Sequence, residues 1–144
     1  RFIGGKTDIV MMLNGALAGL VAITAEPLTP GPITAMIIGS VGAAIMYYGT
    51  KMLENFGLDD VVGAIPVHMF AGIFGTLVVP LTNSDTSFGT QLVGVLSVCV
   101  FSFALSWLTF TTLKSTIGLR ISKEAEKLGT DKAEVGVTAY SIRD

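Results

Sequence analysis

The chain has 144 residues, of which 51% are hydrophobic and only 14% are charged. Soluble globular proteins carry about a quarter charged residues, so this composition indicates a membrane protein. A formal net charge of −2 gives no basic surface for nucleic acid, and the single cysteine, Cys99, offers neither a disulfide partner nor a zinc cluster.

Four apolar segments follow one another along the chain. A spanning helix needs about 20 apolar residues, because a rise of about 1.5 Å per residue must cover about 30 Å of hydrocarbon. The sequence therefore predicts an all-α fold, a polytopic membrane helix bundle over residues 1–118 followed by a tail at residues 119–144. The predicted spans cover approximately residues 9–25, 32–50, 61–81 and 90–113.

The basic residues predict the orientation of these spans, since Lys and Arg near spans stay in the cytoplasm. All nine fall before the first span, between the second and third, or after the fourth. The other two connections, EPLTPGP and TNSDTS, contain none. We therefore expect both chain ends on the cytoplasmic side of the membrane, which we take to be a plasma or inner membrane.

Small residues recur four positions apart within the predicted spans. In lipid, such residues let helix backbones approach closely and gain van der Waals contact. We interpret them as ordinary packing positions within a bundle, and no dimer follows from them. The pairs are Gly15 with Gly19, Gly39 with Ala43, and Ala71 with Gly75.

The third span begins in LDDVVGAIPVH and contains the only histidine, His68. Asp59 and Asp60 suit a helix cap, because a carboxylate accepts free backbone N–H groups at the positive end of the helix dipole. Pro66 removes a backbone hydrogen bond and can open the helix locally. At helical rise, His68 lies roughly 10 Å beyond Val61.

A histidine at that depth should be neutral and should face the bundle interior, because a charge there is costly. One alternative is a satisfied core residue; the other is a polar station in a transport pathway. Haem or zinc ligation would need further ligands at span depth, and catalytic motifs such as HExxH or a nucleophile elbow are absent. The sequence therefore predicts no metal, no cofactor and no enzyme.

Four stretches of the chain resemble the ammonium transporter family, which includes the Mep and Rhesus proteins. They are GKTDIVMMLNGALAGLVAIT, LDDVVGAIPVH, GLRIS and GTDKAEVGVTAY, in that order. The resemblance implies an eleven-span fold of two inverted five-helix repeats plus a final helix, a trimer, and one pore per subunit. This chain would then supply spans eight to eleven and a cytoplasmic C-terminus.

The resemblance also implies roles for individual residues. His68 matches the second of two pore histidines that share a hydrogen bond, and Thr24 matches a hydroxyl position at the outer recruitment site. The tail, which in relatives contacts a neighbouring subunit and can receive a PII-type regulator, is matched at several positions. These positions are Arg120, Gly129, Asp131, Gly136 and Tyr140.

The expected function is transport of ammonium or methylammonium through a hydrophobic pore with a twin-histidine site. Deprotonation near the entrance would avoid carrying a charge through a dry passage, and neutral imidazoles would then offer polar contacts to ammonia. An alternative is an ammonium sensor that signals through the tail. An intramembrane enzyme has little support, because no nucleophile and base are paired.

Overall fold

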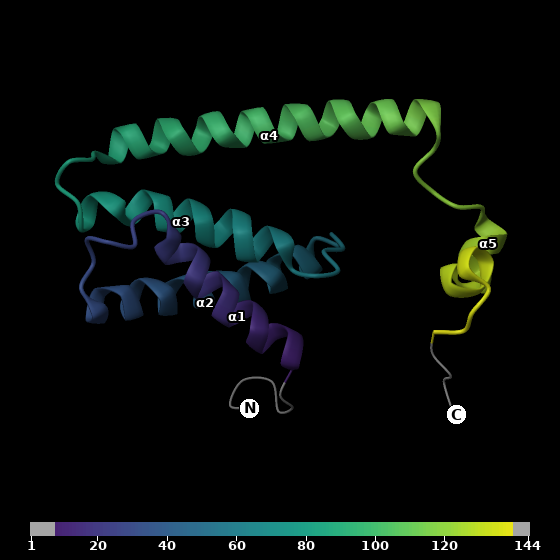
Figure 1. Cartoon of the computed structure of the whole chain (residues 1–144), viewed down its shortest axis with the longest axis horizontal. Coiled ribbons are helices and arrows are strands. Elements are labelled where there is room, and N and C mark those ends of the chain that lie inside the picture. The colour runs from purple at the N-terminus through teal and green to yellow at the C-terminus, as the bar shows by residue number, and fades with distance from the viewer. Residues whose placement is uncertain (1–7, 140–144) are drawn as a thin grey trace. The chain divides into compact units, whose positions relative to one another are not determined.

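The computed structural model describes residues 8–139, and all regular elements in that range are helical (Figure 1). The all-α class predicted from the sequence is thus confirmed. In chain order the elements are α1 (Ile9–Thr24), α2 (Pro32–Asn55), the π-helical segment η1 (Ile65–Phe70), α3 (Ala71–Val78), the short 3-10 helix η2 (Val79–Leu81), α4 (Phe88–Thr116), α5 (Lys123–Leu128) and the π-helical segment η3 (Asp131–Val135).

The chain divides into two compact units, Arg1–Cys99 and Val100–Asp144, and the division falls within α4. In the first unit, α1 packs against α2 and against α3, while η1 packs against both α1 and α2 (Figure 1). The second unit contains the C-terminal part of α4, followed by α5 and η3, which contact each other.

Glycines let the helices of the first unit touch through their backbones. A Cβ built on Gly19 of α1 would lie 3.1 Å from the carbonyl oxygen of Gly39 in α2. A Cβ on Gly42 would lie 2.6 Å from the Cβ of Ala22, and one on Gly75 of α3 would overlap the Ala22 backbone. The predicted close packing at small residues is therefore present, and it joins α1 to both of its neighbours.

A small apolar cluster fills the space between these backbones. It consists of Ala18, Met46, Val67 and Ala71, which are at most 2% exposed. Each of the three packed segments contributes to it: α1 through Ala18, α2 through Met46, and the segment containing η1 and α3 through the other two. Val67 immediately precedes the histidine, so the core fixes the backbone at that point.

Local sequence signals account for the helix ends. The carboxylate of Asp8 accepts a hydrogen bond from the N–H of Met11 and caps α1. Pro32 occupies the first turn of α2, where its missing N–H costs nothing. Gly57, at a φ of +69°, ends the same helix, and its N–H reaches the carbonyl of Glu54.

Two helices, α2 and α4, are long and apolar enough to cross a membrane. The first helix and the combined segment Ile65–Leu81 are apolar but shorter, so four crossings stay a prediction. α2 extends to Asn55, about one turn beyond the predicted end of the second span, and α4 has no buried side chain within the described residues.

Candidate functional site

His68 lies in η1, which continues directly into α3. The N–H of Ala71, which closes this segment, reaches the carbonyl of Pro66 five residues earlier. Proline cannot donate a backbone hydrogen bond, so the ordinary helical ladder is interrupted just where the π-helical spacing occurs. Such π-helical turns are frequent at functional sites. The local opening expected at Pro66 is present around the histidine.

The start of this segment is held by one aspartate. Oδ1 of Asp60 accepts the N–H of Ala64 at 2.9 Å, and Oδ2 accepts the N–H of Ile65 at 2.8 Å. Asp59 is exposed, and within residues 8–139 its side chain accepts no backbone N–H. The sequence offered both aspartates as caps, and the cap geometry is found at Asp60.

The loop before η1 is also tied to α1, by a contact that sequence reasoning missed. Nδ2 of Asn14 donates to the carbonyl oxygen of Val62 at 2.9 Å. Gly63 follows at a φ of +74°, and a Cβ there would lie 2.5 Å from Nδ2 of Asn14. Glycine is therefore needed both for the backbone conformation and for the space. The available signal was an amide in the otherwise apolar run LNGALAGLVAIT.

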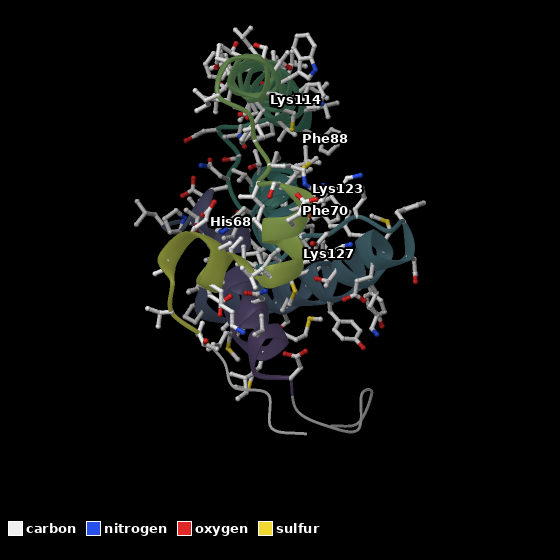
Figure 2. All side chains as sticks on the ribbon, turned by 90° about the vertical axis from the view of Figure 1, so that its right-hand side faces the viewer. His68, Phe70, Phe88, Lys114, Lys123 and Lys127 are labelled. Carbon is white, nitrogen blue, oxygen red and sulfur yellow. The ribbon has the colours of Figure 1, made fainter. Side chains whose placement is uncertain are left out.

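The histidine side chain points out of the part of the fold that this chain forms (Figure 2). Its predecessors Pro66 and Val67 are buried, whereas His68 and Met69 are exposed. Between residues 8 and 139, no hydrogen bond involves either ring nitrogen. The core-residue alternative requires burial, so His68 is not a core residue of the described part of the chain.

Thr24 is the last residue of α1 and is exposed. Its hydroxyl donates to the carbonyl of Leu20 at 2.7 Å, as threonines in helices often do. Just beyond it, Oε2 of Glu26 accepts a hydrogen bond from Nδ2 of Asn83 at 2.9 Å. This bond joins the α1–α2 connection to the α3–α4 connection, the two loops without basic residues.

The tail begins with a turn and a short helix. Gly118, at a φ of +81°, ends α4, and the hydroxyl of Ser122 accepts the N–H of Ala125 to cap α5. Arg120 forms an ion pair with Glu126 of that helix. Both partners are largely exposed, so this pair contributes little to stability.

Asp131 organises the end of the described tail. Its Oδ2 accepts the N–H of Ala139 at 2.9 Å, eight residues later. Hydrogen bonds from the backbone N–H groups of Ala139 and then Lys132 lower the pKa of this carboxyl below its ordinary value. Gly129 and Gly136 flank η3 at φ values of +98° and +74°. Tyr140, the last tail position expected from the sequence, lies outside the described residues.

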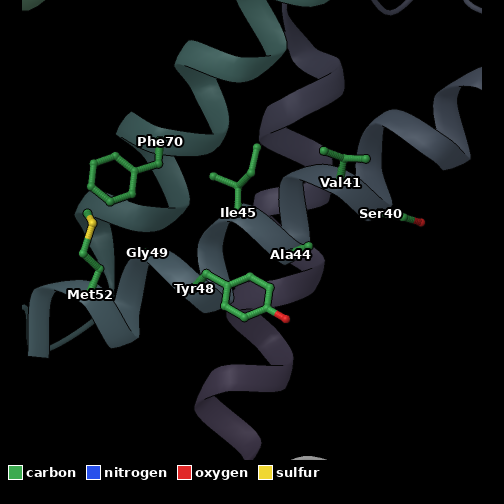
Figure 3. A pocket seen from close by; sticks show the side chains of 8 residues that line it. All are labelled: Ser40, Val41, Ala44, Ile45, Tyr48, Gly49, Met52 and Phe70. Atoms are coloured by element: carbon green, nitrogen blue, oxygen red, sulfur yellow. The ribbon is translucent and has the colours of Figure 1, made fainter. Parts of the chain in front are cut away.

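An apolar groove of about 550 Å³ runs along α2 beside the histidine segment (Figure 3). Phe70 of η1 closes one side, and Gly49 lies beneath it, where a Cβ would meet the Phe70 ring. In the described ranges no three His, Cys, Asp or Glu side chains gather as a metal site would require. The remaining lining residues are Ser40, Val41, Ala44, Ile45, Tyr48 and Met52.

Comparison with known proteins gives a single family. The Ammonium Transporter Family matches residues 1–140. The Ammonium transporter Amt2 of Archaeoglobus fulgidus is 38% identical over 94% of this chain and 33% of its own length. The Ammonium transporter Amt2 of Methanocaldococcus jannaschii is 32% identical over 96% of this chain and 35% of its own.

A third relative, the Ammonium transporter of Corynebacterium glutamicum, is 31% identical over 99% of this chain and 35% of its own length. The chain thus spans about a third of the length of the curated relatives that it matches. The match extends over the three packed helices, the capped π-helical segment with its histidine, and the tail. On this ground the chain belongs to the ammonium transporter family, whose members are polytopic membrane proteins.

Proposed function

We propose that the protein moves ammonium across a membrane, with His68 as one of two histidines in a hydrophobic pore. The proposal rests on one observation: His68 lies exposed in the π-helical segment of a chain that belongs to the ammonium transporter family. Asp60, Gly63 and Asn14 fix the start of its helical segment, and the buried Val67 fixes the position before it. The imidazole is left exposed on the chain that carries it.

Neutral imidazole suits this task because one ring nitrogen donates and the other accepts a hydrogen bond. Ammonium would lose its proton near the entrance, and ammonia would pass along polar contacts in an otherwise apolar passage. A pair of histidines could also relay the proton, since each ring can take one proton and release another. Potassium cannot shed a proton, so this route would reject it.

Thr24 is proposed to lie at the outer recruitment site. Its hydroxyl already donates to Leu20, so its oxygen lone pairs are what it would offer to an ammonium ion. Glu26 lies two residues further on, in the α1–α2 connection, and gives this region one carboxylate.

The test is transport by the complete protein reconstituted in liposomes. We expect His68→Leu to abolish methylammonium uptake or to change its discrimination against potassium. Met69→Leu, at the adjacent exposed position, is the matched control and should retain uptake. Unchanged flux and selectivity in the His68 variant would overturn the role assigned to this residue. Loss of uptake in both variants would point to disrupted packing instead.

The same assay separates transport from sensing. If the wild-type protein folds and binds methylammonium but moves none, the sensor alternative replaces the transporter. The relatives compared above are named transporters, which favours flux and argues against an enzyme.

We further propose a homotrimer with a cytoplasmic C-terminus. The tail is then available to a neighbouring subunit or to a PII-type regulator, and its described part is an ordered unit held by Asp131 and the cap of α5. Native mass spectrometry of the purified protein should give the mass of three subunits. A cysteine placed at exposed Val137 should react with a membrane-impermeant reagent only from the cytoplasmic side.

A further inference from the structure

A second groove, of about 360 Å³, lies along the C-terminal part of α4, and we call it the α4 groove. Each of its helical members has another member three or four residues away, so they form a single stripe on one face of the helix. Three of them are aromatic, and Lys114 is the last of them on the helix. The lining residues are Phe103, Ser106, Trp107, Phe110, Thr111 and Lys114, with Leu119 beyond the helix end.

We infer that the α4 groove binds one anionic phospholipid, with its phosphate on Lys114 and an acyl chain along the aromatic stripe. The charge of Lys114 carries the first part of this inference. Within residues 8–139 the one ion pair joins Arg120 to Glu126, so Lys114 has no carboxylate partner. From Phe88 to Leu113, α4 contains no charged residue, so Lys114 is the first cation met on leaving the apolar stretch.

The hydroxyl groups of α4 point to the same occupant. Thr112, Ser115 and Thr116 lie outside the groove, and each donates to a carbonyl of its own helix. Thr111 and Ser106 line the groove, and within the described chain neither hydroxyl makes a hydrogen bond. Thr111 lies one turn below Lys114, at the level where the ester oxygens of a lipid would follow its phosphate.

The length of the stripe also fits a lipid chain. From Phe103 to Lys114 the helix rises by roughly 16 Å, which is about half of the 30 Å hydrocarbon core. The groove therefore covers one leaflet from its surface to near the midplane. Trp107 lies between these ends, and its ring combines an apolar body with a single N–H donor.

This inference depends on α4 crossing the membrane with Lys114 on the cytoplasmic side, and not on the transport role of His68. One Lys or Arg near an anionic lipid surface contributes about 1 kcal/mol to its attraction to that surface, which is about fivefold in affinity. The readout is therefore lipid binding, which can be measured whether or not the protein transports ammonium.

The experiment compares phosphatidylglycerol with phosphatidylcholine of the same acyl chains, each titrated into the delipidated native protein and followed by native mass spectrometry. We expect phosphatidylglycerol to bind more tightly, Lys114→Gln to lower its affinity about fivefold, and Lys114→Arg to preserve it. Phosphatidylcholine carries the same phosphate but balances it with its own choline cation, so its affinity should respond less than that of phosphatidylglycerol to Lys114→Gln. Lys123→Gln, a lysine of α5 outside the groove, is the matched control and should leave both affinities unchanged.

A crosslink identifies what occupies the groove in the membrane. With benzoylphenylalanine in place of Phe103, irradiation of native membranes should attach lipid to the protein. A crosslink to another segment of the protein, or to a second subunit, would overturn the inference, because polypeptide would then fill the groove. Equal affinity for the two lipids, or an unchanged affinity in Lys114→Gln, would overturn it as well.

Discussion

The side-chain amide of Asn14 donates to the carbonyl of Val62, so a residue of α1 holds the loop that precedes the histidine 54 positions later in the chain. The bond is 2.9 Å long and lies next to Gly63, whose missing Cβ leaves room for the amide. Together with the two bonds that Asp60 accepts, it makes the backbone before His68 a fixed structure. The position of the imidazole thus depends on a helix that does not contain it.

Replacing Asn14 should weaken this arrangement. We expect Asn14→Leu to lower the free energy of unfolding by about 1 kcal/mol, because the Val62 carbonyl loses its donor. Methylammonium uptake should fall with it, since the histidine segment loses one of its ties. Thermal unfolding of the complete protein in detergent and uptake in liposomes would measure the two effects. Ser40→Ala removes a hydroxyl that is bonded only within α2, so it should change neither the unfolding temperature nor the uptake. If Asn14→Leu also left both unchanged, this account would be contradicted.

Gly63 should tolerate no side chain, for two separable reasons. Gly63→Ala puts a side chain on a residue that already has a positive φ, which costs about 1–2 kcal/mol, and its Cβ meets the Asn14 amide. Gly57→Ala is the matched control, because Gly57 also has a positive φ but has open space around it. We expect the Gly63 variant to lose more stability than the Gly57 variant. The excess should shrink when Asn14→Ala is added, and an equal loss in both glycine variants would show that the overlap does not matter.

The contact between α1 and α3 should be equally sensitive to added volume. Gly75→Ala places a methyl group against the Ala22 backbone, which cannot move as a flexible side chain would. We expect a loss of about 3 kcal/mol, at the upper end of the usual cost of overpacking. Gly94→Ala in α4 has open space and should be neutral or stabilise the helix by up to about 1 kcal/mol. The two thermal unfolding midpoints, measured side by side, check the prediction.

The order of the tail should depend on pH through Asp131. The pKa of this carboxyl is lowered in the folded tail, chiefly by the N–H of Ala139, so its charged form stabilises the folded state. That contribution is complete above the ordinary value of 3.8 and declines as the pH falls toward the lowered folded value. We expect the protection of the Ala139 amide against hydrogen exchange, measured relative to the intrinsic rate at each pH, to fall over this acidic range.

Asp131→Asn is the control for that measurement. An asparagine oxygen can still accept the Ala139 N–H but does not titrate between pH 2 and 6. The protection of the Ala139 amide in this variant should therefore not fall with acid in the same way. An identical pH profile in the two proteins would mean that another group controls the order of the tail.

The sequence alone predicts much of this fold because its strongest signals are local. An uncharged run of sufficient length predicts a helix, the pair at Asp59 and Asp60 predicts a cap, and Pro66 predicts a local opening. The structure has a helical element in each of the four apolar segments, and the cap geometry occurs at Asp60. The π-helical segment occurs at Pro66.

Contacts between distant residues could not be predicted in the same way. The predicted third span begins at residue 61, whereas η1 begins at Ile65, because Gly63 adopts a positive φ and the Asp60 side chain takes the first N–H groups. The bond from Asn14 joins residues 48 positions apart, and no periodicity in the sequence indicates it. The hydrogen bond between Glu26 and Asn83 is of the same kind.

The uncharged stretch of α4, from Phe88 to Leu113, contains 26 residues. A straight helix of this length extends roughly 39 Å, against a hydrocarbon thickness of about 30 Å. A crossing helix with such an excess of length tilts, kinks or thickens the surrounding lipid. Hydrophobic mismatch at this one helix would make the protein responsive to bilayer thickness, so lipids with longer acyl chains should relieve the tilt.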